Sequence, residues 1–203
     1  MASADGAAGP DPSEEQRLAF IATLNERLPT KRVIAQGILR NDSGAVLLAE
    51  LTYKLEWDLP GGVADRFESP AACLRRECRE ELGVDVSVGD LLTTAWLPPY
   101  RGWDDAVVFL FDLGVQQADW ITGLDLQERE IIALHWVSPA DLEEHVAPYA
   151  VRLIRAALAA TCPAYLEDGY PAALGPASGR PADHDHSPAH HDSPTDHTDV
   201  ESS

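Results

Sequence analysis

Three glutamates, Glu77, Glu80 and Glu81, lie close together in a stretch whose pattern predicts a helix. Spacings of three and four residues place their side chains on one arc of the helix, roughly 100° wide. At a separation of ~5.5 Å and an effective dielectric constant of ~20, each close pair repels by about 3 kcal/mol before screening. A divalent cation removes this repulsion, and carboxylate oxygens suit Mg²⁺. The spacing favours a metal site over the alternative, an ordinary solvated acidic face.

The helix that carries these glutamates is predicted to run from Ser69 to Gly83. Ser69 is a good N-cap, Pro70 suits the first helical position, and Gly83 suits a left-handed residue after the last turn. Glu81 borders an apolar stripe, which places it near the core boundary. The stripe at helical spacing comprises Ala71, Leu74, Cys78 and Leu82.

The stretch from Trp57 to Val84 resembles the Nudix box, G-x5-E-x7-R-E-U-x-E-E-x-G-U, in which U is aliphatic. Residues 62–84 match every fixed position at the required spacing, with Cys78 at one aliphatic position as the single soft departure. A buried thiol behaves there as a small hydrophobe. The flanking strand pattern extends the resemblance to roughly residues 30–160. The resemblance implies an α/β fold: an α/β/α sandwich with a mixed sheet and a catalytic loop–helix–loop.

The resemblance also implies a reaction. In Nudix enzymes the box binds divalent cations that bridge a diphosphate, and water attacks one phosphorus. A nucleoside diphosphate linked to a group X is thereby cleaved to a nucleoside monophosphate and phosphoryl-X. Metal ions neutralise the phosphate oxygens and lower the pKa of a bound water. We therefore expect Mg²⁺ as the cofactor, with Mn²⁺ as a substitute.

The site residues follow from the matching positions. Glu77, Glu80 and Glu81 are the expected metal ligands, with the backbone carbonyl of Gly61 as a further one. Glu68 and Arg76 are expected to orient these glutamates within the catalytic set. The general base is left open among four carboxylates: Glu80, Glu81, Glu128 and Glu130.

A loop after the box carries the candidates for substrate binding. Trp96, Tyr100 and Trp103 are suited to stack on a purine or a ribose, and Arg101 is suited to meet a phosphate. The alternative is that Trp96 and Tyr100 pack under the sheet edge, and that Arg101 is merely exposed. The expected substrate is a nucleotide sugar such as ADP-ribose, or a nucleoside triphosphate.

Charge and cysteine content restrict the partners. The net charge is −19, and residues 1–168 already hold 28 acidic against 14 basic residues, which argues against binding a nucleic-acid polymer. Three cysteines form no paired framework, and no apolar run of membrane-spanning length is present. We expect a cytoplasmic protein that binds a small nucleotide and no membrane.

The chain divides by composition into four parts. Residues 1–12 are expected to be disordered, residues 13–29 to form a helix, and residues 30–168 to form the catalytic domain. That helix packs either on the domain or against a second subunit, so a homodimer is left open. Residues 169–203 hold five histidines among Asp, Ser and Pro and are expected to be a disordered tail rather than a transition-metal site.

Strands are predicted at 32–40, 45–51, 85–95, 106–113 and 131–137, with a break near Gly89. A short helix is predicted after Ser138-Pro139, and a last helix at 147–160. Two functions from different classes compete. The first is a metal-dependent hydrolase, and the second is a non-catalytic domain of the same fold that senses a nucleotide. The complete set of box glutamates favours the enzyme, because a sensor has no need of a cation site.

Overall fold

The computed structural model describes residues 12–172. The expected disordered segment before Pro12 and residues 173–203 of the expected tail lie outside the described residues. Helix α1, Pro12–Arg27, occupies the stretch where a helix is predicted, and its side chains are exposed from Ser13 onward. Within residues 12–172, none of the helices combines the length and apolar character that crossing a bilayer requires.

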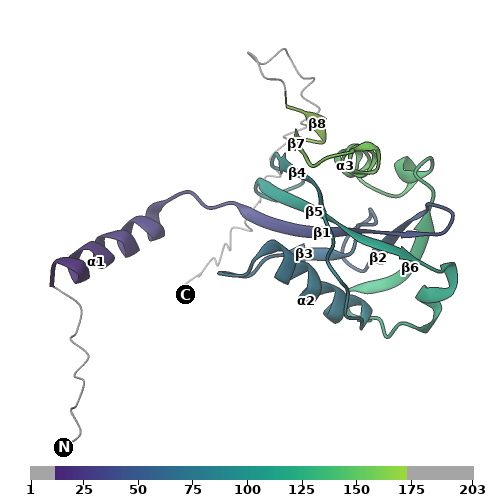
Figure 1. Ribbon diagram of the computed structural model, residues 1–203, viewed down its shortest axis with the longest axis horizontal. Helices are drawn as coiled ribbons and strands as arrows, with labels where there is room; N and C mark the ends of the chain where they lie inside the picture. The colour runs from purple at the N-terminus through teal and green to yellow at the C-terminus, as the bar shows by residue number, and fades with distance from the viewer. Residues whose placement is uncertain (1–11, 173–203) are drawn as a thin grey trace, which may run out of the picture. The chain divides into compact units, whose positions relative to one another are not determined.

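A mixed sheet of eight strands forms the centre of the domain, in the order β6-β2-β1-β5-β4-β7-β8, with β3 paired to β1 (Figure 1). β1 is parallel to β5 and antiparallel to both β2 and β3. The strands span Arg32–Asn41 (β1), Val46–Leu51 (β2), Gly61–Val63 (β3), Leu91–Leu97 (β4), Ala106–Gln116 (β5), Ile131–Val137 (β6), Ala164–Glu167 (β7) and Tyr170–Pro171 (β8).

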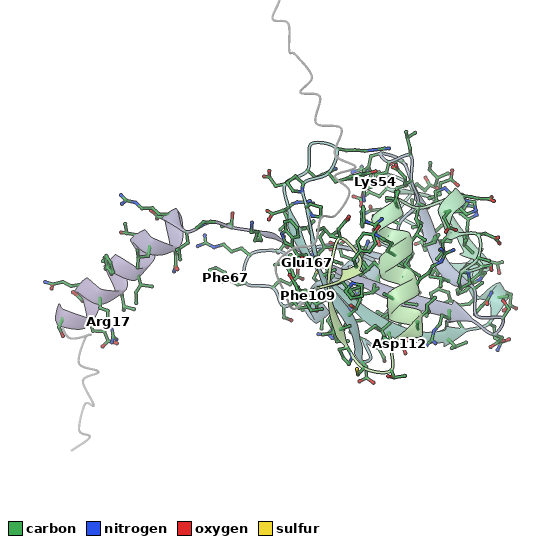
Figure 2. All side chains as sticks on the ribbon, turned by 90° about the horizontal axis from the view of Figure 1, so that it is seen from above. Arg17, Lys54, Phe67, Phe109, Asp112 and Glu167 are labelled. Atoms are coloured by element: carbon green, nitrogen blue, oxygen red, sulfur yellow. The ribbon has the colours of Figure 1, made fainter. Side chains whose placement is uncertain are left out.

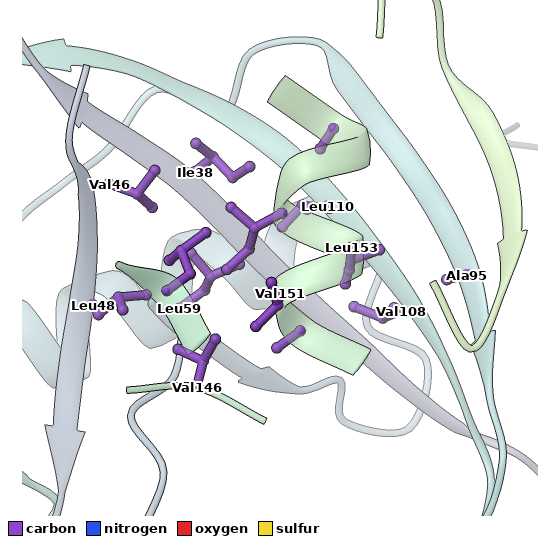
Figure 3. Close-up of a cluster of buried hydrophobic side chains, with 14 of the residues drawn as sticks. Ile38, Val46, Leu48, Leu59, Ala95, Val108, Leu110, Val146, Val151 and Leu153 are labelled. Carbon is purple, nitrogen blue, oxygen red and sulfur yellow. The ribbon is translucent and has the colours of Figure 1, made fainter. Parts of the chain in front are cut away.

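Two α-helices cover opposite faces of this sheet: α2, Pro70–Leu82, and α3, Pro148–Ala159 (Figure 1). Each face of the sheet has its own hydrophobic core. Both cores receive side chains from the same strands, because successive side chains of a strand point to opposite faces. On β1, Ile38 packs toward α3 (Figure 3), whereas Leu39 packs toward α2. The α/β/α sandwich with a mixed sheet is confirmed.

The elements that differ from expectation are short or lie at the sheet margin. Only Leu91–Leu97 forms a strand in the predicted 85–95 segment. The structure adds β3, the β7–β8 hairpin and a 3₁₀ helix at Ala118–Gly123, and it replaces the helix expected after Ser138 by a 3₁₀ turn at Leu142–Glu144. β8 lies inside the stretch expected to be tail, so the fold continues to residue 172. Strands of two to four residues carry too little periodicity to be recognised from sequence.

Candidate functional site

Helix α2 begins and ends as its sequence predicts. The Ser69 hydroxyl accepts a hydrogen bond from the Ala72 N–H, and Gly83 follows the last turn with φ 69°. Cys73, Leu74, Cys78 and Leu82 are buried against the sheet, with Cys73 replacing the expected Ala71 as a fully buried member. This packing fixes the helix, and with it the direction of the three glutamates.

The glycine turn of β3 lies directly against two of those glutamates. The Gly61 N–H donates to Glu81 Oε2 at 3.1 Å. A Cβ added to Gly62 would lie 2.5 Å from Glu77 Oε1, so the Glu77 carboxylate packs on the Gly62 backbone. Gly61 has φ 127°, and a Cβ there would lie 2.1 Å from the Ala35 carbonyl oxygen. The sequence Gly61-Gly62 is therefore what allows β3, β1 and the carboxylates to approach one another.

Arg76 connects the remaining acidic groups of the box. Its Nε and Nη2 donate to the two oxygens of Glu68, at 3.0 and 2.8 Å. Its Nη1 donates to Glu77 Oε1 at 2.9 Å and to Glu80 Oε2 at 3.0 Å. A fork of this kind holds several carboxylates in fixed directions. The structure thus brings Arg76 and Glu68 together with Glu77 and Glu80.

Burial and like charge shift the acidities of the site. Burial raises the pKa of Glu81 to about 8, against the opposing effect of the Gly61 N–H, and the charge of Glu77 adds to the rise. Burial also raises the pKa of Glu77, which Arg76 partly counters. The hydrogen bonds from Arg76, followed by that from the Asp65 N–H, lower the pKa of Glu68 to about 2. The two glutamates beside the glycine turn are therefore the ones that a bound cation would stabilise most.

Two further carboxylates, Asp58 and Glu130, act on the same group, since both raise the pKa of Glu81. Asp58 accepts hydrogen bonds from Gln36 Nε2 at 2.6 Å and from Lys54 Nζ at 2.7 Å. Sequence reasoning named Glu130 and missed Asp58. The available signal was an acidic residue three positions before Gly61, at the approach to the turn.

The donor set fits a hard cation, although the structure holds no converged cluster. Within residues 12–172, no three side chains among His, Cys, Asp and Glu are arranged to hold a metal ion. Glu77 and Glu80 instead contact Arg76, and Glu81 accepts a hydrogen bond from the Gly61 N–H. The Gly61 carbonyl as a further ligand stays a prediction. The fit rests on chemistry: two partly buried carboxylates with raised pKa values lie side by side on a glycine turn. Oxygen donors of this type suit Mg²⁺ or Mn²⁺.

The aromatic loop after β4 divides into two parts. Tyr100 meets Tyr149 of α3 edge to face, with ring centroids 5.6 Å apart, and Arg101 pairs with Glu56 at 2.8 Å. Asp58 is among the charges that raise the pKa of Tyr149, after burial as the main cause. The structure therefore brings Tyr100 and Arg101 toward the segment that carries Asp58.

The two tryptophans expected in this loop have other partners, and Trp96 lies in β4 rather than in the loop. Trp96 is half-buried, and its Nε1 donates to Asp105 at 2.9 Å. Trp103 is half exposed, with the Arg32 guanidinium 5.0 Å from its ring. Their ring contacts with substrate stay a prediction.

Trp57, which opens the box segment, has both faces of its ring covered. His135 and His145 stack on either side of it, with centroids 4.0 and 4.1 Å away. His135 also contacts Glu50, at 2.9 Å between Nε2 and Oε2. This stack anchors the residue immediately before Asp58, so it positions the approach to the glycine turn and leaves no open indole face for a base.

Comparison with known proteins adds a family match. The family model described as the NUDIX domain matches residues 30–157. A MutT-like protein of Streptomyces ambofaciens is 29% identical over 63% of this chain and 78% of its own length. A CTP pyrophosphohydrolase of Escherichia coli (strain K12) is 30% identical over 62% of this chain and 90% of its own length.

Among solved structures, the MutT protein of Methanosarcina mazei Go1 matches with a TM-score of 0.51 and 26% identity. The match covers 61% of this chain and 89% of that protein. The helix–turn geometry described above lies inside residues 30–157, which the family model matches.

Proposed function

Because this chain belongs to the Nudix family, we propose that it cleaves the diphosphate linkage of a nucleoside diphosphate derivative to give a nucleoside monophosphate, using Mg²⁺ or Mn²⁺. One observation carries the proposal: the carboxylates of Glu77 and Glu81 lie against the Gly61-Gly62 turn, and both have raised pKa values. Three relatives are named as a diphosphatase or a pyrophosphohydrolase, which supports a hydrolase that acts on a phosphoanhydride bond.

The residues of the site would have different roles. Glu77, Glu80 and Glu81 would hold the cation, and Glu68 keeps Arg76 in place to orient Glu77 and Glu80. When bound, the cation supplies charge neutralisation at the phosphate oxygens and a more acidic water. A carboxylate must accept the proton of the attacking water. Of the two loop candidates, Glu130 is the better supported, because its charge is among the causes that raise the pKa values of both Glu77 and Glu81.

The substrate would extend from this cluster toward Tyr100 and Arg101. Their contacts with Tyr149 and Glu56 place them beside the Asp58 segment, where a base or ribose can stack and a phosphate can meet the guanidinium. A small nucleotide suits this loop, in keeping with the CTP and 8-oxo-dGTP activities by which two relatives are named.

A substrate screen tests the proposal against the nucleotide-sensing alternative. The purified full chain is incubated with CTP, 8-oxo-dGTP and ADP-ribose, with Mg²⁺, with Mn²⁺ or with a chelator, and released monophosphate is measured. We expect turnover of at least one compound that stops with the chelator. Binding without turnover would establish the sensor instead, and neither binding nor turnover would refute both functions.

Metal affinity should rise with pH, because the raised pKa of Glu81, about 8, means that the cation must displace a proton below that pH. For one displaced proton, the affinity for Mn²⁺ should increase roughly 50-fold from pH 6 to pH 8. Without metal, the folded state holds more protons than the unfolded state between the unperturbed value and pH 8, so the free energy of unfolding falls as pH rises through that window. Calorimetric titration in buffers of different ionisation enthalpy measures both the affinity and the proton release. An affinity independent of pH would remove Glu81 from the ligand set.

The cytoplasmic location and the homodimer stay predictions. Cys73, Cys78 and Cys162 are free thiols, which supports a reducing compartment. Exposed apolar side chains along α1, such as Ile21 and Leu24, support a helix that packs on another surface.

A further inference from the structure

Phe67 is the most unusual side chain of the box segment. It lies in the loop between β3 and α2, has φ 68°, and is 93% exposed. In Figure 2 its side chain projects from the surface of the domain. A left-handed backbone is unfavourable for a residue with a Cβ, and glycine would adopt it freely. A ring exposed to this degree gains almost nothing from burial. Neither the backbone nor the core therefore explains a phenylalanine at this position.

The position of Phe67 relates it to the site. The next residue is Glu68, whose carboxylate accepts hydrogen bonds from both Nε and Nη2 of Arg76. Arg76 in turn contacts Glu77 and Glu80. The ring of Phe67 thus belongs to the loop that supports the candidate diphosphate-binding carboxylates. In the sequence this loop follows β3, whereas the Asp58 segment precedes it.

A cation accompanies the ring. The Arg66 guanidinium lies 4.8 Å from the centroid of the Phe67 ring. Because the side chain is so exposed, part of the ring remains accessible to a ligand. An arginine beside an exposed aromatic ring forms a surface on which a nucleobase stacks while a neighbouring phosphate meets the positive charge. We call Arg66 and Phe67 the stacking pad.

We propose that the stacking pad binds a second planar base, carried by the group X on the far side of the diphosphate. The proposal rests on the proposed function and narrows its substrate class to nucleoside diphosphates whose X ends in a nucleoside. Phe67 is then a specificity-determining residue, and its left-handed backbone is retained because the ring contacts substrate. Diadenosine diphosphate and ADP-ribose form a matched pair of probes, since they differ only in the second adenine.

Three variants separate the ring from the backbone. Phe67→Gly removes both the ring and the strain, Phe67→Ala removes the ring alone, and Phe67→Trp keeps a ring. We expect Phe67→Gly and Phe67→Ala to raise KM for diadenosine diphosphate about 3- to 10-fold, with KM for ADP-ribose within about twofold of wild type. Phe67→Trp should retain the wild-type ratio of the two KM values. Only Phe67→Gly should raise Tm, by about 2 °C.

The possible outcomes distinguish a failure of the stacking-pad proposal from a failure of the proposed hydrolase function. Equal changes in KM for the two probes would show that Phe67 acts through Glu68, and no change would show that it does not touch substrate; either result overturns the proposal. If the wild type hydrolyses neither probe nor any compound of the screen, the proposed function fails, and equilibrium dialysis with Ca²⁺ then tests the stacking pad alone. Turnover of CTP or 8-oxo-dGTP without cleavage of either probe would overturn the stacking pad and leave the proposed function intact. Tighter wild-type binding of diadenosine diphosphate, lost in Phe67→Gly, supports the pad. Equal binding of the two probes, or no binding, overturns it.

Discussion

Glu81→Gln is expected to lower kcat by about 100- to 10,000-fold. The bound cation stabilises the charge of the transition state by several kcal/mol, and it is held in place by ionised ligands such as Glu81. The amide oxygen of glutamine can still accept the Gly61 N–H that now donates to Glu81. The burial that raises the pKa of Glu81 also favours a neutral group there, so the variant should fold at least as stably as wild type without metal. Turnover of the best substrate from the screen and the Mn²⁺ affinity are measured together.

Glu77→Gln and Glu80→Gln extend the test along the helix. Glu77 is mostly buried and Glu80 is half exposed, so the former should weaken Mn²⁺ binding more strongly. The matched control is Glu144→Gln, an exposed glutamate of the 3₁₀ turn outside the site, which should retain wild-type turnover. Unchanged turnover in both Glu80→Gln and Glu81→Gln would contradict the metal assignment.

The sequence predicted the helix that carries the site because every local signal agrees. Ser69, Pro70 and Gly83 fix its ends, and the buried stripe fixes its orientation on the sheet. It also predicted that the three glutamates share an arc. It could not predict their different surroundings, since the burial of Glu81 and the exposure of Glu80 depend on how closely β3 approaches the helix.

The contribution of Asp58 illustrates why the rest of the site was missed. Its partners are Gln36, 22 residues earlier, and Lys54, in a loop without periodicity. The long-range pair of Asp58 with Gln36 arises from sheet register, which sequence patterns specify only for strands with a clear alternation. The stack of Trp57 between His135 and His145 has the same origin, because β6 and the turn before α3 meet it from distant parts of the chain.

Gly61→Ala should abolish the site by unfolding its support. A Cβ would lie 2.1 Å from the Ala35 carbonyl oxygen and 2.9 Å from the Gln36 Cα, and φ 127° is nearly restricted to glycine. The combined strain and overlap should lower the free energy of unfolding by about 2–5 kcal/mol. Separation of β3 from β1 would also carry the Gly61 N–H away from Glu81, so turnover should fall with stability. Chemical denaturation and steady-state kinetics measure the two effects.

Two other glycines separate the effect on stability from the effect on turnover. Gly44 has φ 81° with nothing within 4 Å of an added Cβ, so Gly44→Ala should lower stability by about 1 kcal/mol and leave kcat unchanged. At Gly62 an added Cβ would meet only the movable carboxylate of Glu77, at 2.5 Å from Oε1. Gly62→Ala should therefore keep most of the stability while displacing Glu77 and reducing turnover. If Gly61→Ala and Gly44→Ala proved equally stable, close packing of β3 on β1 would not be what holds Glu81 beside the turn.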